Sequence, residues 1–180
     1  MALGATIYNF TVALSDVDRG VYETLEFKAA RHPSESAEYL VTRVLAYCLE
    51  YAEGIAYSRG LSEPDQPALA VRDLTGAIRS WIEIGAPDAA RLHKAAKAAP
   101  RVAVYTHRDP HALLKQFEGE KIHRAGEIEL HAFDRDFIAQ LVKRLERRMK
   151  LELSVSDRHL YLSLGGETLA GAVEKLALGN

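Results

Sequence analysis

The sequence predicts a single mixed α/β domain over residues 1–180, and three observations support that prediction. Apolar and polar residues alternate with a period of two near both ends of the chain, which is typical of β-hairpins. A strand, a helix and a second strand follow one another over residues 78–106, which favours a right-handed parallel βαβ unit. No clear linker interrupts the 180 residues, a length that suits one domain.

The N-terminal part of the chain predicts a hairpin followed by a helix. Residues 6–14 and 21–29 alternate on either side of an Asp/Gly-rich turn, so we expect two antiparallel strands there. The helix is expected to run from Ser34, as its N-cap, to about Glu53. Glu35 would then lie in the first turn, where the helix dipole favours an acid.

The middle of the chain predicts one long irregular stretch and then a strand–helix–strand unit. Residues 59–77 form the irregular stretch, with a short strand at 68–72, and long loops in compact domains are often functional. The elements expected after it are a strand at 78–84, a helix at 88–98 that Asp88 caps, and a strand at 101–106.

The last third predicts two helices and a second set of strands. Asp109-Pro110 is a strong helix start, and that helix ends at Gly119. The remaining expected elements are a strand around Ile128–Ala132, a helix from Asp134 or Asp136 that buries residues up to Leu145, a hairpin around Asp157-Arg158, and a strand over 167–177.

Composition excludes several classes of protein. The formal net charge is −2, so global charge indicates no particular partner. Cys48 is the one cysteine, which excludes an intrachain disulfide and a cysteine-based zinc site and suits a cytoplasmic location. No apolar run is long enough to span a membrane, and residues 1–16 read as a strand rather than a signal peptide. P-loop, dinucleotide-binding, nucleophile-elbow and HExxH motifs are absent.

Short segments spread over most of the chain carry a resemblance to a known family. They are Met1-Ala2-Leu3 with Ala5-Thr6-Ile7-Tyr8, Ala30-Arg31-His32-Pro33-Ser34-Glu35, Arg59-Gly60-Leu61, Trp81-Ile82-Glu83-Ile84-Gly85 with Pro87-Asp88, and Tyr105-Thr106. With them the chain resembles the YaeQ family of small bacterial proteins. The αβββαβ order of the central elements is similar to the PD-(D/E)XK, or restriction-endonuclease-like, core. The resemblance therefore implies such a core with added N-terminal and C-terminal β-hairpins.

The resemblance also implies a metal site built from three acids. Carried over residue by residue, Glu35 is the helix acid, Asp73 the aspartate of the core hairpin and Glu83 the strand acid. Asp65, in Pro64-Asp65, is a competing choice for the aspartate. Such oxygens would bind Mg²⁺ or Mn²⁺, because hard cations prefer carboxylate ligands and keep positions open for water and phosphate.

One residue departs from the superfamily pattern. The lysine of (D/E)XK would fall at position 85, which is Gly85. A working site would then need a cation from elsewhere, and Lys94 or Lys97 on the next helix could supply it. Arg31, just before Glu35, is the other cation expected to lie close. We expect Glu35, Asp73 and Glu83 to share one cleft, and we predict that Lys94 or another basic group reaches it.

Each of these residues also has a structural interpretation. Glu83 could be the partner of Arg31 or Arg79, since an unpaired buried charge is costly. Asp73 could bond its own turn, and Glu35 could serve only the helix dipole. Lys94 could be an ordinary solvated lysine.

Two hypotheses about function follow. In the first, the protein is a metal-dependent phosphodiesterase acting on nucleic acid, with Asp73, Glu83, Lys94 and Arg31 in catalytic roles. In the second, it is a non-catalytic protein- or nucleic-acid-binding regulatory module on a degenerate nuclease scaffold, linked to transcription. A basic cluster at the end of a predicted helix is the one local charge feature that would suit nucleic acid; it comprises Lys143, Arg144, Arg147, Arg148 and Lys150.

Overall fold

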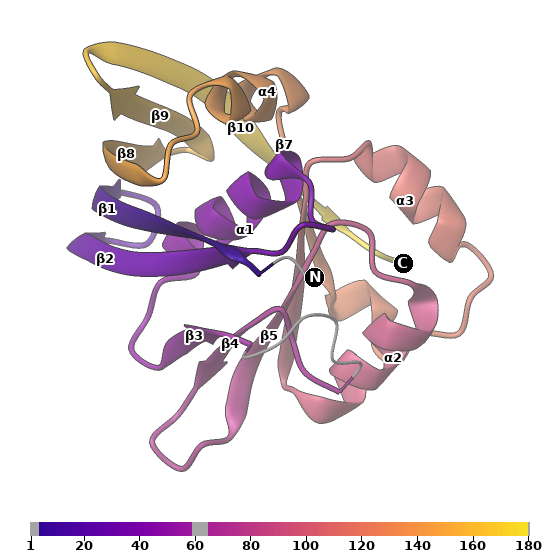
Figure 1. Ribbon diagram of the computed structural model, residues 1–180. Helices are drawn as coiled ribbons and strands as arrows, with labels where there is room; N and C mark the ends of the chain where they lie inside the picture. The colour runs from indigo at the N-terminus through magenta and orange to yellow at the C-terminus, as the bar shows by residue number, and fades with distance from the viewer. Residues whose placement is uncertain (1–3, 59–64, 180) are drawn as a thin grey trace. The chain divides into compact units, whose positions relative to one another are not determined.

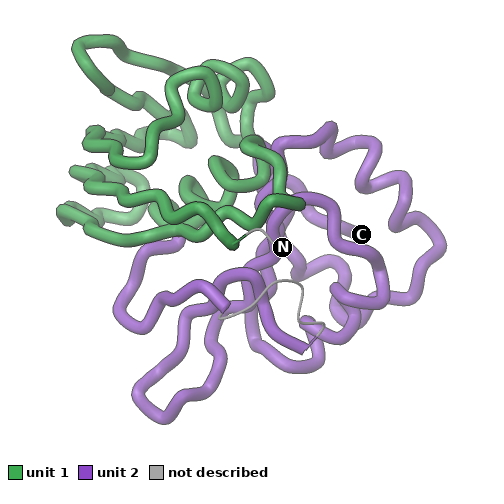
Figure 2. Tube along the Cα trace, viewed as in Figure 1, with its two compact units in different colours: residues 1–49, 133–173 green, residues 50–132, 174–180 purple. Residues whose placement is uncertain are grey.

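The computed structural model describes residues 4–58 and 65–179, and the chain forms two compact units (Figures 1 and 2). Unit 1 comprises residues 1–49 and 133–173, and unit 2 comprises residues 50–132 and 174–180. Both units are mixed α/β, as predicted, whereas the single domain stays a prediction. The family-like segments at 1–3 and 59–61, together with Pro64, lie outside the described residues.

Unit 1 holds five strands in the order β2-β1-β8-β9-β10. They are β1 (Thr6–Asp16), β2 (Val21–Arg31), β8 (Arg148–Ser156), β9 (His159–Leu164) and β10 (Glu167–Ala177), whose last residues belong to unit 2. Both predicted hairpins and the predicted final strand are confirmed, with each neighbouring pair in the hairpins antiparallel. β1 runs parallel to β8, which joins the two hairpins into one surface.

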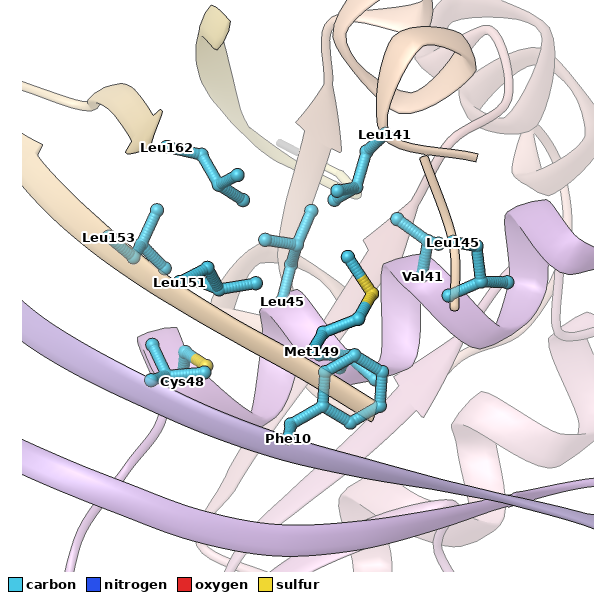
Figure 3. Close-up of a pocket in the computed structure, with 12 residues that line it drawn as sticks. Phe10, Val41, Leu45, Cys48, Leu141, Leu145, Met149, Leu151, Leu153 and Leu162 are labelled. Carbon is cyan, nitrogen blue, oxygen red and sulfur yellow. The ribbon is translucent and has the colours of Figure 1, made fainter. Parts of the chain in front are cut away.

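One face of this sheet is covered by α1 (Ala37–Leu49) and α4 (Arg135–Lys143), and the other is open to solvent. β8 shows the pattern plainly, because exposed and buried residues alternate along its whole length. The covered face closes around an apolar cavity of about 10 Å³ lined by side chains such as Phe10, Leu45 and Met149 (Figure 3). A cavity that small and apolar stays dry and holds no ligand.

Two helix ends in unit 1 differ from the prediction. α1 begins at Ala37, because the Ser36 hydroxyl accepts a hydrogen bond from the backbone N–H of Tyr39 at 3.0 Å. Ser34, the predicted cap, instead contacts the His32 ring at 2.8 Å. α4 is capped by Asp134 and ends at Lys143, so the basic residues that follow lie beyond the helix.

Unit 2 holds five strands in the order β7-β6-β5-β4-β3. They are β3 (Ile55–Tyr57), β4 (Leu69–Arg72), β5 (Ile78–Ile84), β6 (Arg101–Thr106) and β7 (Glu129–Phe133). β3, β4 and β5 are antiparallel, whereas β5, β6 and β7 are parallel. The predicted βαβ unit is therefore confirmed, with α2 (Ala89–Ala98) between β5 and β6 and Asp88 as its N-cap.

The core of unit 2 lies between its sheet and two helices, α2 and α3 (Pro110–Phe117). α3 starts at Pro110 after the predicted Asp109 cap, and a short 3₁₀ turn, Ala125–Glu127, precedes β7. Trp81, Val104 and Leu130 from the strands meet Leu92 of α2 in this core, and Leu178 near the C-terminus joins them. None of the described helices is long and apolar enough to cross a membrane.

Candidate functional site

Glu83 lies near the end of β5 in unit 2 and is fully engaged by two neighbours. The indole Nε1 of Trp81 donates to Glu83 Oε1 at 2.6 Å, and Nε of Arg91 donates to Oε2 at 2.8 Å. Glu83 is only 4% exposed, so the pair is shielded from water on the carboxylate side. Arg91 also donates to the carbonyl of Gln66 at 2.6 Å, which ties α2 to the segment before β4. The partner of Glu83 is therefore Arg91 rather than Arg31 or Arg79.

Asp73 lies in the turn between β4 and β5, where it bonds its own backbone. Its Oδ1 accepts from the hydroxyl and the N–H of Thr75 and from the N–H of Ala77. These bonds, that of the Thr75 hydroxyl first, hold the pKa of Asp73 below its usual value. β4 pairs with β5 so that Arg72 faces Ile78, and Glu83 stands roughly 16 Å further along the strand. The expectation that Asp73 and Glu83 share a cleft is thus corrected.

Asp65, the competing aspartate, lies on the same side of the unit as Glu83. It forms an ion pair with Lys94 of α2, and its neighbour Gln66 is bound by Arg91. Arg91 and Lys94 are three residues apart on α2, so both point from one helix face toward the Asp65–Gln66 segment. The basic group of this helix that reaches Glu83 is Arg91, while Lys94 reaches Asp65.

Glu35 and Arg31 belong to unit 1 and stabilise a local turn there. Glu35 Oε1 accepts from the N–H of His32 at 2.9 Å, and its Oε2 lies 3.6 Å from Arg43. Arg31 donates to the carbonyl of Glu35 at 3.1 Å. Glu35 precedes α1 instead of lying in its first turn, which corrects its predicted position in the helix.

The carboxylates as arranged do not fit the predicted Mg²⁺ or Mn²⁺ ion. The part of the chain that the structure describes holds no group of three His, Cys, Asp or Glu residues that could bind a metal. Asp65 and Glu83 each already have a cation beside them, and both oxygens of Glu83 accept hydrogen bonds. A divalent ion would have to displace the Arg91 guanidinium, which is anchored at two points.

A second polar cluster in unit 2 was not predicted from the sequence. Arg101 on β6 binds both oxygens of Glu129 on β7, at 2.8 and 2.9 Å, and also binds Glu50. The Tyr105 hydroxyl donates to Glu50, and the His131 ring bonds Glu129 at 2.9 Å. The rings of Tyr105 and His131 stack with centroids 4.5 Å apart.

The charges of this cluster stabilise one another. The hydrogen bond from His131, and then those from Arg101, hold the pKa of Glu129 well below its usual range. Burial opposes the charged form of Arg101, but Glu129 and Glu50 raise its pKa above the usual value. Burial and the nearby Glu50 carboxylate raise the pKa of Tyr105. Since each carboxylate is matched by donors, we interpret the cluster as a rigid polar centre of the sheet.

The exposed face of unit 1 carries a basic groove between β1 and β8. It is lined by Asn9, Thr11, Arg148, Met149 and Lys150. Arg148 lies opposite Asn9 and Lys150 opposite Thr11, and Asn9 in turn lies opposite Lys28 on β2. Among the described residues these three cations form no ion pair, in contrast to Arg144, which binds Glu167. The predicted basic helix end is therefore corrected, because Arg148 and Lys150 lie on an open strand face, which also holds the acids Glu26 and Glu152.

Comparison with known proteins gives one consistent result. The family model described as "YaeQ protein" matches residues 1–173. The "Uncharacterized protein YaeQ" of Escherichia coli K12 is 34% identical over 165 residues, 91% of each chain, and that of Salmonella typhi is 34% identical over 164 residues, again 91% of each. These curated names state no activity.

Two crystal structures are also similar to this chain. The YaeQ protein from Pseudomonas syringae has a TM-score of 0.85 and 30% identity, covering 98% of this chain and 97% of that one. The YaeQ protein from Xanthomonas axonopodis pv. citri has a TM-score of 0.87 and 27% identity, covering 96% and 98%.

Proposed function

We propose that this chain, which belongs to the YaeQ family, is a non-catalytic nucleic-acid-binding module built on a restriction-endonuclease-like core. The order α1, β3, β4, β5, α2, β6 supports such a core, because it repeats the αβββαβ arrangement of that superfamily. The pairing of β3 to β6, antiparallel twice and then parallel, is consistent with it. The function itself rests on two features, one on each unit.

The observation that carries the proposal is the basic groove of unit 1. Arg148, Lys150 and Lys28 are exposed cations on one open sheet face, and polar Asn9 and Thr11 lie between them. Phosphate oxygens are the natural partners of such unpaired cations beside hydrogen-bonding side chains. No aromatic side chain lines the groove, so backbone contacts rather than base stacking would supply the affinity.

The hydrogen bonds that occupy both oxygens of Glu83 favour nucleic-acid binding without hydrolysis. A catalytic carboxylate must be open to a metal or to water, but the carboxylate of Glu83 holds Arg91 and Trp81 instead. Gly85 supplies no cation, and Asp73 is committed to its turn. The acids of the superfamily pattern thus serve the fold in this chain.

The proposal is tested by fluorescence anisotropy with a labelled single-stranded oligonucleotide and its duplex over a range of salt concentrations. Three phosphate contacts predict that the logarithm of the binding constant falls with that of the salt concentration with a slope of about −2 to −3. The variant Arg148→Glu/Lys150→Glu should abolish most of the binding. Lys97→Glu/Lys115→Glu is the matched control, since it makes the same change in net charge on exposed helix ends of unit 2. No binding by the parent at low salt, or equal losses in both variants, would refute the proposal.

A metal-dependent phosphodiesterase is the second candidate, although its ion could bind Glu83 only after the Arg91 guanidinium has moved away. Arg91 and Lys94 bring two cations to Glu83 and Asp65, which is where a nuclease would need charge near a phosphate. Titration with Mn²⁺ while the melting temperature is followed separates the candidates. If Mn²⁺ raises the melting temperature of the parent but not that of Asp65→Asn, the enzyme is supported. If Mn²⁺ leaves the melting temperature of the parent unchanged, the binding module is supported.

A further inference from the structure

Strand β2 ends the sheet of unit 1 and offers a long edge, along which the Arg43 guanidinium already binds the carbonyl of Ala30. It pairs with β1 over eleven consecutive residues without a bulge, whereas strands commonly hold about five or six. Within residues 4–58 and 65–179 no strand pairs with its outer edge (Figure 1). A straight, unpaired edge of this length is a template for another strand unless its side chains prevent pairing.

We propose that β2 binds the β2 strand of a second copy of this chain, antiparallel, about a two-fold axis at Phe27. Such an axis, perpendicular to the sheet, keeps the open face on the same side in both copies. Opposed residues must then share a face, so the axis passes through a residue and not between two. The charges of β2 decide which residue that is.

With the axis at Phe27, opposite charges face each other at every charged position. Glu26 of each copy faces Lys28 of the other on the open face, and Glu23 faces Arg31 on the covered face. Glu23, Glu26 and Lys28 are exposed, and within the described residues they form no ion pair. The two open-face pairs lie on either side of the axis, so each copy contributes one acid and one base.

Neighbouring registers lose this match. An axis at Glu26 sets Glu26 opposite itself, and an axis at Lys28 sets Lys28 opposite itself, so like charges meet. An axis at Leu25 sets Glu26 opposite Thr24 and pairs no opposite charges. Charges on an edge strand usually block association, but among these registers only the one with its axis at Phe27 sets opposite charges against each other.

The residue at the proposed axis suits a contact between copies. Phe27 is only half-buried, although its ring stacks on Tyr47 at 4.2 Å and on Phe10 at 5.5 Å between centroids. Its position is therefore fixed by aromatic neighbours inside unit 1, and the residue as a whole remains partly accessible. A second Phe27 across the axis would lie directly opposite it on the same face of the sheet.

Sedimentation equilibrium over a range of protein concentrations tests the proposal. The parent is expected to dimerise. Lys28→Glu places an acid opposite Glu26, and Glu26→Lys places a base opposite Lys28, so each should weaken the dimer by about tenfold or more because two symmetry-related pairs change together. The double variant Glu26→Lys/Lys28→Glu restores opposite charges and should return the dissociation constant to within a few-fold of the parent.

The control variant reverses a charge that lies away from the proposed interface. Glu152→Lys reverses a charge on the open face of the interior strand β8 and should leave the dimer unchanged. A parent that is monomeric at all concentrations, single variants that dimerise like the parent, or a double variant as weak as the single ones would each overturn the proposal. Circular dichroism of every variant checks that the charge changes at exposed positions leave the fold intact.

Discussion

Replacing Glu83 by Gln removes the charge that binds Arg91 while keeping the size of the side chain. In the parent, one oxygen of Glu83 accepts from Trp81 and the other from Arg91. The amide of a glutamine has only one oxygen, so its NH₂ group must face one of these two donors. The substitution therefore leaves a buried donor without an acceptor and a guanidinium without its carboxylate.

The expected loss of stability can be estimated from the exposure of the two partners. Removing one member of a buried ion pair costs about 3–5 kcal/mol. The Arg91 side chain is 24% exposed and keeps its bond to the Gln66 carbonyl, so we reduce the expected cost to about 2–4 kcal/mol. At roughly 2–4 °C per kcal/mol, the melting temperature should fall by roughly 4–16 °C.

Urea denaturation and thermal melting of Glu83→Gln measure this loss directly. Glu152→Gln is the matched control, because Glu152 is an exposed strand glutamate, and its loss should change stability by no more than about 0.5 kcal/mol. The double variant Glu83→Gln/Arg91→Met should lose less than the sum of the two single variants, since the same pair is broken in each.

One result would refute this reasoning about Glu83. If Glu83→Gln is as stable as the parent or more stable, the carboxylate is a strained functional group and not the partner of Arg91. The catalytic hypothesis would then regain its central residue, and a melting temperature that rises with Mn²⁺ only in the parent would support it.

Three further predictions concern groups away from Glu83. Burial raises the pKa of the Cys48 thiol to about 12, so a thiol reagent at mildly alkaline pH should react with it only as fast as unit 1 opens; rapid reaction of the native protein would contradict this. Because His131 and Arg101 lower the pKa of Glu129 in the folded state, its share of stability is present above the unfolded value of about 4.5 and is lost as pH falls below it. The stability of the parent should accordingly fall more steeply than that of Glu129→Gln below about pH 4.5, and parallel curves from urea titrations would disprove the assignment. A Cβ at Gly171 would lie 2.6 Å from Cβ of Phe137, so Gly171→Ala should cost about 1–3 kcal/mol by urea denaturation, and an unchanged midpoint would show that the neighbouring helix can shift.

The sequence predicted most of the elements of this fold because local signals mark their boundaries. Asp88 and Asp109-Pro110 begin α2 and α3 where the caps indicate. The predicted start of α1 was wrong. Ser34 and Ser36 are both good N-cap residues, and only the hydrogen bonds around them select Ser36.

The candidate site was harder to predict, because it depends on register between distant segments. Asp73 is closer to Glu83 in sequence than Asp65 is, but the β4–β5 hairpin sends Asp73 to the far end of the strand. Arg101 binds Glu50 and Glu129 from positions that no motif connects. The one available signal was the alternation of polar residues on the otherwise apolar strands β6 and β7.

The path of the chain through the two units has a consequence for how the protein is made. Unit 1 begins with β1, β2 and α1 but lacks the rest of its sheet until Val173 has been synthesised. At ~5–20 residues per second, the roughly 120 residues after α1 take roughly 6–25 s to emerge, far longer than local collapse needs. During this time α1 is the only helix of unit 1 that can cover the apolar face of the first hairpin, and unit 2 receives Leu178 later still. Each unit is thus completed only after part of the other has been synthesised.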